Sequence, residues 1–286
     1  ERGAPQLINS VPSSPSDASA CPAASFSASK RADVGGRPPA DAATPPQPTP
    51  GARSAGIVKP GEAYMGWNTP SPRATPQPQA TGGVPGIDVS GWQGNVDWQG
   101  QWNLGKRFAY VKATEGTGFR NSSFTQQYNG SYDVGMIRGS YHFALPDRST
   151  GAAQAEFFAR NGGGWSRDGK TLPGVLDIEY NPYGASCYGL SQTAMVSWIS
   201  SFTTRYKQLT GRDAVIYTTT DWWKTCTGST TRFGATNPLW IARYASTPGE
   251  LPAGWGYYTF WQYSDTPIDQ DTFNGDLTRL RVLATG

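Results

Sequence analysis

Hydrophobic and polar positions alternate in two ways from residue 84 onward. One helix is predicted over 191–210, where apolar side chains recur on one helical face between the candidate N-cap Ser191 and the candidate stop Gly211. Shorter helices are predicted at 122–133 and 150–160. Seven apolar runs rich in β-branched and aromatic residues predict strands. They read VPGIDVS, RFAYVKAT, MIRGSYHFA, PGVLDIEY, DAVIYTT, PLWIARY and YYTFWQYS.

Strands that alternate with helices predict a parallel α/β sheet. Residues 84–286 number 203, at the low end for a (β/α)-barrel. The late strands follow one another with little room for helices between them. We therefore expect an irregular, TIM-like (β/α)-barrel whose last third lacks full helices.

The composition changes before residue 84. Of the 23 prolines, 15 lie within the first 80 residues, among Ala, Ser, Thr and Gly. Such a segment buries too little apolar area to offset the entropy of ordering it. We predict a flexible Pro/Ala/Ser-rich tail over residues 1–83, followed by one catalytic domain at 84–286. Within the tail, Tyr64, Met65 and Trp67 are clustered, so we expect residues 64–70 to dock on the folded domain; the alternative is that they are solvent-exposed spacer residues.

Charge and hydropathy exclude several classes of partner. The chain carries 24 Lys and Arg against 21 Asp and Glu, a net charge of +3, which is too small to indicate nucleic-acid binding. No run of about 18 apolar residues predicts a membrane span. The start at Glu1 does not read as an intact signal peptide, as expected of a mature secreted protein.

The three cysteines indicate the cellular compartment in which the protein resides. Cys187 and Cys226 flank a segment that reads as folded, and we expect them to form a disulfide in an oxidising, extracellular location. Cys21 lies in the tail, and the odd count leaves three free thiols as the alternative.

Two acids follow the apolar pair Val175 and Leu176 in LPGVLDIEYNP. Because side chains alternate along a strand, Asp177 and Glu179 share one face at the strand's carboxyl end, where parallel α/β folds build their sites. Their mutual repulsion would raise the pKa of one of them, as a general acid near neutral pH requires. The alternative is a solvated strand end or a salt bridge.

Further acids lie at other strand ends. Asp88 closes the first strand and would face the same mouth, although it could instead cap the turn that follows. Asp269 follows the last strand-like run in PIDQDTFNGD. Spacing alone does not choose among Asp269, Asp271 and Asp276.

Aromatic residues also lie at or near the predicted strand ends, where their flat rings suit pyranose faces. The alternative for many of them is the barrel core. The substrate-binding candidates are the aromatic residues Tyr141, Phe143, Tyr180, Tyr217, Trp240 and Trp261 and the polar Gln262. Tyr244 and Tyr263 are similarly placed.

Other chemistries are excluded. The run GWSRDGKT matches a phosphate-loop expression, but a predicted helix precedes it and Pro173 opens a strand after it, the reverse of the required order. The single His142 excludes a His-rich metal site, and no G-x-S-x-G signal accompanies it. We expect His142 to be packed and hydrogen-bonded, and we predict neither a metal nor a cofactor.

An ordered series of motifs resembles glycoside hydrolase family 25, the Chalaropsis-type lysozymes that include secreted actinomycete muramidases. The series is GIDVSGWQGNVDW, FAYVKATEG, GMIRGSYHFA, GVLDIEY, VIYTT and FWQYSD with IDQDTFNG. The resemblance runs from Gly86 to the C-terminus. It implies an irregular barrel with an acidic groove that cleaves, with retention, the β-1,4 bond between N-acetylmuramic acid and N-acetylglucosamine.

Carried over by motif, the resemblance implies roles for individual residues. Glu179 would be the acid/base, and Asp177 would orient the substrate's acetamido group as it attacks the anomeric carbon. Asp88 and Asp269 would tune charge and hold substrate, or one of them would be a direct nucleophile. Tyr141 falls on the family's third-strand aromatic.

The implied partner is the glycan of bacterial peptidoglycan, bound by a secreted monomer. A chitinase-like hydrolase of N-acetylglucosamine polymers would use the same D-x-E chemistry. A non-catalytic wall-binding module is a further alternative, but it would not need a poised acid.

Overall fold

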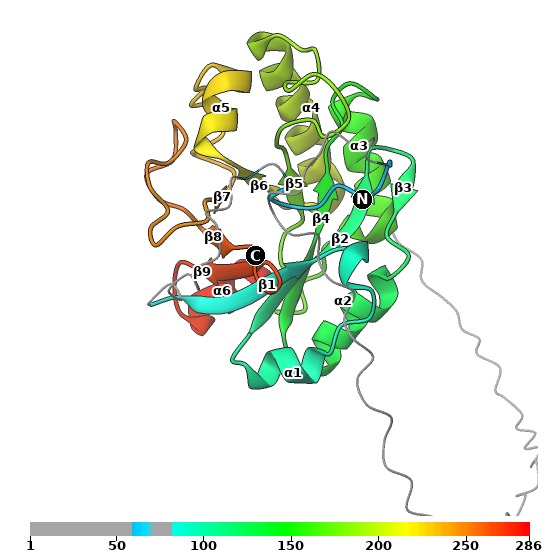
Figure 1. Cartoon of the computed structure of the whole chain (residues 1–286), viewed down its shortest axis with the longest axis vertical. Coiled ribbons are helices and arrows are strands. Elements are labelled where there is room, and N and C mark those ends of the chain that lie inside the picture. Colours follow the sequence, from blue (N-terminus) through cyan, green and yellow to red (C-terminus); the bar gives the residue numbers. More distant parts are fainter. Residues whose placement is uncertain (1–58, 68, 70–81) are drawn as a thin grey trace, which may run out of the picture. The chain divides into compact units, whose positions relative to one another are not determined.

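The computed structural model describes residues 59–67, 69 and 82–286, and its centre is a closed β-barrel (Figure 1). Strand β1 pairs with both β2 and β9, which closes the ring, and the short β3 (Phe119–Arg120) pairs with the last residues of β2. The predictions for residues 1–58 and 70–81 lie outside the described residues. The eight barrel strands are β1 (Val84–Val89), β2 (Phe108–Glu115), β4 (Ile137–Phe143), β5 (Val175–Asp177), β6 (Val215–Thr218), β7 (Leu239–Ala242), β8 (Phe260–Ser264) and β9 (Gln270–Phe273).

All seven predicted strands are present, and they run parallel from β1 through β8. The eighth, β9, was not predicted, and it runs antiparallel to both β8 and β1. Gln270 of β9 lies opposite Ile87 on one side and Ser264 on the other. Because β9 is reversed, its first residue lies at the edge of the barrel where the parallel strands end.

The longest predicted helix is confirmed as α4 (Gln192–Thr210). The Ser191 side chain accepts from the Ala194 N–H, and Gly211 ends the helix at φ +74°. The helices α2 (Phe124–Asp133) and α3 (Gly151–Phe158) occupy the other two predicted ranges. Within the described residues, no helix separates β7 from β8 or β8 from β9, as expected. The sequence did not predict α1 (Trp98–Asn103), α5 (Thr220–Thr227), α6 (Leu277–Thr285), η1 (Gly91–Gln93) or η2 (Ala159–Gly163).

Aromatic rings fill the barrel interior. The Trp240 ring lies 4.8 Å from Tyr110, 5.4 Å from Phe260 and 5.6 Å from Tyr217 between centroids. Such packing leaves the barrel a core and not a pore, as in other (β/α)-barrels. Substrate chemistry therefore has to lie at the rim.

His142 packs on the outer face of the barrel, against α4. Its ring stacks 5.4 Å from that of Phe202, Thr114 Oγ1 lies 2.8 Å from Nδ1, and Gln154 Oε1 lies 2.9 Å from Nε2. Burial lowers the pKa of His142 to about 4, so the ring is neutral near pH 7. The expectation of a packed, hydrogen-bonded histidine is confirmed.

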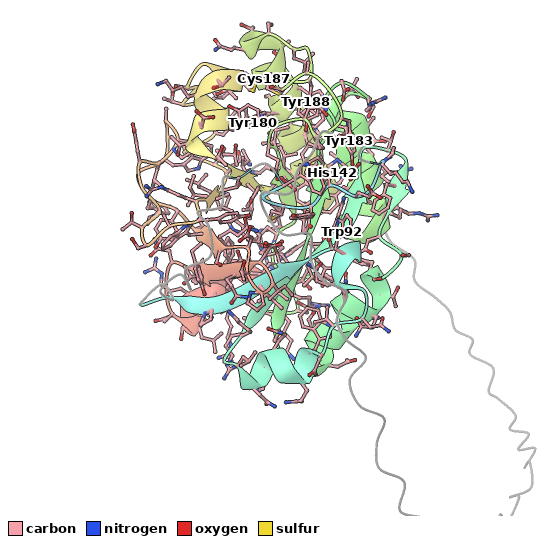
Figure 2. The ribbon with its side chains drawn as sticks, viewed as in Figure 1. Trp92, His142, Tyr180, Tyr183, Cys187 and Tyr188 are labelled. Carbon is pink, nitrogen blue, oxygen red and sulfur yellow. A yellow bond between two sulfur atoms is a disulfide. The ribbon has the colours of Figure 1, made fainter. Side chains whose placement is uncertain are left out.

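A disulfide joins Cys187, in the loop after β5, to Cys226 in α5, with 5.4 Å between the Cα atoms (Figure 2). The predicted pair is thus confirmed. Among the described helices, none has the length and apolar character that a membrane crossing needs.

Candidate active site

Four predicted acids meet at the rim where the parallel strands end. Asp88 lies on β1, Asp177 is the last residue of β5, Glu179 follows two residues later, and Asp269 immediately precedes the reversed β9. Their exposed fractions are 0%, 0%, 2% and 1%. Electrostatic interactions couple Asp88 to Glu179, Asp177 to Glu179, and Asp269 to Asp88. The structure therefore gathers these four carboxyl groups into one buried cluster.

Burial perturbs the acids of this cluster. It raises the pKa of Asp88 to about 7; the nearby Glu179 acts in the same direction, and hydrogen bonds from Gln262 and Asp271 oppose it. Burial and then Glu179 raise the pKa of Asp177 well above its ordinary value, while Lys112 opposes the rise. Burial and then Asp88 do the same to Asp269. The cluster therefore retains protons at pH values where isolated aspartates are ionised.

Gln262 on β8 holds Asp88 in place. Its Nε2 donates to Asp88 Oδ2 at 2.7 Å, while its Oε1 accepts from the hydroxyls of Tyr217 at 2.6 Å and Tyr244 at 3.1 Å. The two tyrosines fix which end of the amide faces the carboxylate. Gln262 and Tyr217 were both sequence candidates, and Tyr244 was named beside them.

The three acids near β9 differ in position, and only Asp276 lies away from the cluster. Asp271 is fully buried on β9, opposite Gly86, and its pKa is raised well above the ordinary value by burial and then by Asp88. Asp276 lies elsewhere, because it caps α6 and accepts from the Arg279 N–H at 2.8 Å. Both Asp269 and Asp271 therefore belong to the cluster.

Sequence reasoning missed a buried ion pair on β2. Lys112 Nζ lies 2.6 Å from Glu115 Oε2, and both side chains are almost completely buried. Electrostatic interactions connect Lys112 to Asp177 and Glu179 as well. The available signal was strand alternation: Lys112 shares the inward face of Tyr110, where an apolar residue is expected.

Three of the aromatic candidates lie next to the cluster. Burial and the carboxyl groups of Asp88, Asp177 and Asp269 together raise the pKa of Tyr141. The Phe143 ring centroid lies 5.4 Å from Lys112 Nζ. Tyr217 contacts Gln262, as described above.

The other aromatic candidates lie in the barrel interior, on its outer face or in a loop. Trp240 is fully buried within the barrel. Trp261 alternates with the inward Gln262, and its Nε1 donates to the Arg243 carbonyl at 2.9 Å. Tyr180 is half-buried and donates to Asp221 Oδ2 at 2.7 Å (Figure 2). The structure thus does not bring Trp261 to the acid cluster, whereas Trp240 reaches it from the barrel interior through Asp271.

A segment that precedes the barrel reaches these acids. The Gly66 N–H donates to Glu179 Oε1 at 2.8 Å, and the Met65 N–H donates to the Tyr141 hydroxyl at 3.5 Å. Figure 1 shows residues 59–67, drawn in blue, near the labelled β4 and β5. The nearly complete burial of Glu179 thus includes contact with another part of the same chain.

Comparisons with known proteins place this geometry in context. The model of the glycosyl hydrolases family 25 matches residues 87–272. Lysozyme M1 of Streptomyces globisporus is 50% identical over 263 residues, covering 86% of this chain and 88% of the relative. The N,O-diacetylmuramidase of Chalaropsis sp. is 48% identical over 210 residues, covering 71% of this chain and 100% of the relative.

Solved structures agree with these relatives. A muramidase from Acremonium alcalophilum has 61% sequence identity and a TM-score of 0.70, covering 71% of this chain and 99% of its own. A lysozyme from Streptomyces coelicolor has 52% identity and a TM-score of 0.70, covering 72% and 98%. Residues 84–286 are 203 of the 286 in the chain, the same share, so those solved chains correspond in length to the barrel alone.

Proposed function

Because the chain belongs to the glycosyl hydrolases family 25, we propose that it is a muramidase that cleaves the β-1,4 bond between N-acetylmuramic acid and N-acetylglucosamine in bacterial peptidoglycan. The observation that carries this proposal is the gathering of Glu179, Asp177, Asp88 and Asp269 at one rim of a closed barrel. Relatives named lysozyme and muramidase support the same substrate.

Glu179 is the proposed acid/base. In the first step its proton passes to the glycosidic oxygen as the bond to the anomeric carbon breaks. The substrate's own acetamido oxygen attacks that carbon and forms an oxazolinium ion, so no enzyme carboxylate becomes covalently attached. In the second step Glu179 takes a proton from water, which opens the ring. Two displacements at one carbon give retention.

Asp177 is proposed to orient the acetamido group and stabilise its positive charge. Its position beside Glu179 on the same strand end supports this pairing. Asp88 and Asp269 border the same cluster and are proposed to hold substrate and set the local charge. The disulfide supports an extracellular location, because such bonds persist in oxidising compartments. We propose that the enzyme acts there as a monomer.

Two other functions compete with this proposal. A chitinase-like enzyme would use the same acids, and the rates on purified peptidoglycan and on chitin separate the two. A non-catalytic wall-binding module is disfavoured, because burying four carboxyl groups is costly and a binder gains nothing from it.

The test is Glu179→Gln, which removes proton transfer and keeps the side chain's shape. We expect turnover to fall at least about 10³-fold, measured as reducing ends released from purified peptidoglycan. Glu250→Gln, at an exposed position, is the matched control and should keep its activity. Both changes are made in the full chain and in residues 84–286. Near-normal activity of a folded Glu179→Gln barrel would refute the assignment.

A further inference from the structure

Residues 59–67 and 69 lie in the proposed catalytic mouth. The contacts to the acid cluster come from the main chain: the Gly66 N–H binds Glu179 Oε1 at 2.8 Å, and the Tyr244 hydroxyl lies 3.5 Å from the Gly66 carbonyl. The Met65 side chain is fully buried and belongs to the aromatic cluster of the barrel interior with Tyr141. A substrate sugar could not reach Glu179 while this peptide is in place.

A second set of contacts holds the beginning of the segment. Lys112 Nζ donates to the carbonyls of Ala63 and, at 3.2 Å, of Gly61. Glu115 Oε1 accepts from the Gly61 N–H at 2.9 Å. The buried ion pair on β2 therefore binds two carbonyls and one N–H of the same turn, in addition to the contact between the two charges themselves.

Two rim side chains complete the binding of this turn. Trp92 Nε1 donates to the Glu62 carbonyl at 2.5 Å, and the Ala63 N–H donates to the Tyr183 hydroxyl at 3.3 Å (Figure 2). Trp92 lies in η1, which follows β1, and Tyr183 lies in the loop after β5. The segment therefore joins two distant parts of the rim across the mouth.

The fit at Gly66 is close. The residue has φ +83°, and a Cβ atom there would lie 2.0 Å from the Tyr244 hydroxyl and 2.8 Å from Gln262 Oε1. Tyr244 and Gln262 are the side chains that orient Asp88. A peptide group also offers the same N–H donor and carbonyl acceptor as the N-acetyl groups of the proposed substrate, so the two compete for the same partners.

We propose that residues 59–69 are an autoinhibitory segment, an intramolecular competitor that keeps the chain latent until the segment is cut from the barrel or displaced. This inference rests on the proposed muramidase function. Twelve residues separate Thr69 from Gly82, and a tether of that length holds a ligand at an effective concentration of about millimolar. Once the tether is cut, the effective concentration of the segment falls to its concentration in solution. The segment then dissociates on dilution, so activity rises.

The experiment compares the full chain before and after cleavage at a specific protease site introduced within residues 74–79. After cutting and dilution, reducing-end release from peptidoglycan should rise at least about tenfold. A synthetic peptide of residues 59–69 added to the cut enzyme should raise KM and leave kcat unchanged. Equal activity of the cut and uncut chains overturns the inference and leaves the proposed function intact.

Point variants test the same idea without cleavage. Gly66→Ala should activate the uncut chain, because its Cβ meets Tyr244. Gly82→Ala is the matched control: Gly82 also has a positive φ, +108°, but a Cβ there has no heavy atom within 4 Å among the described residues. Activation by Gly66→Ala alone supports the inference, and equal activation by both overturns it. If neither the cut chain nor residues 84–286 hydrolyse peptidoglycan, the proposed function fails and this inference with it.

Discussion

The substitution Asp88→Asn should stabilise the fold at pH 8. It should also remove the part of the pH dependence of stability that the Asp88 carboxyl group causes. Asp88 is fully buried, and its pKa is raised from 3.8 to about 7, chiefly by burial. When folding raises the pKa of an acid, that acid makes its full contribution to stability below the unfolded-state pKa. The contribution is lost as the pH rises through the folded-state pKa. At pH 8 the wild type therefore bears the cost of a buried carboxylate, which asparagine does not.

The magnitude follows from the shift. Each unit of pKa corresponds to about 1.36 kcal/mol, so a rise from 3.8 to about 7 sets an upper bound of about 4 kcal/mol. The amide oxygen introduced by Asp88→Asn would still accept from Gln262 Nε2, which preserves the hydrogen bond seen at 2.7 Å. We expect a gain of about 2–4 kcal/mol, or about 4–16 °C in Tm for a domain of this size.

The assay is thermal unfolding of the full chain at pH 4, 6 and 8, followed by circular dichroism. The advantage of Asp88→Asn should shrink as the pH falls below 7, where the folded wild type takes up the proton, and should nearly vanish near pH 4, where the unfolded state is protonated as well. Asp133→Asn, at an exposed position at the end of α2, should show no such dependence. A variant less stable than wild type at pH 8, or a gain of equal size at pH 4 and pH 8, would show that Asp88 does not carry this cost.

Two further predictions concern stability. Replacing Cys187 and Cys226 by serine should lower the free energy of unfolding by roughly 4 kcal/mol, because the bridge closes a loop with a sequence separation of 39; denaturant unfolding measures this, and an unchanged midpoint would contradict it. His142 has a pKa lowered to about 4, so the unfolded chain takes up its proton first and stability should fall as the pH drops from about 6.5 to 4. His142→Phe should flatten that part of the pH–Tm curve, and an unchanged slope would assign the loss to other groups.

The sequence predicted the elements that carry a strong local signal. The helix α4 has both an apolar face and caps at each end, and the seven parallel strands are apolar runs long enough to read. The acids Asp88, Asp177 and Glu179 were predictable because each closes or follows such a strand. The side chains that gather at a barrel mouth are thus encoded locally.

The missed features depend on the closed ring. The β9 sequence QDTF is short and polar, and its strand character comes from the partners on both sides. Lys112 and Glu115 were missed because their peptide partners lie more than 45 residues away in the sequence. In the sequence, Trp240 and Trp261 look the same as aromatic residues that bind sugars. Only the direction of each side chain shows whether it lies in the barrel interior, on the outer face or at the rim.

The reversed final strand also fixes the order in which the chain can fold. β1 precedes the other described strands in the chain, yet one of its edges pairs with β9, as in the pairing of Ile87 with Gln270. Until β9 emerges, β1 and β8 each keep an unpaired edge, which is a template for association with other chains. Completion of the barrel therefore waits for β9, and a nascent chain that stalls before Gln270 leaves two strand edges unpaired at once.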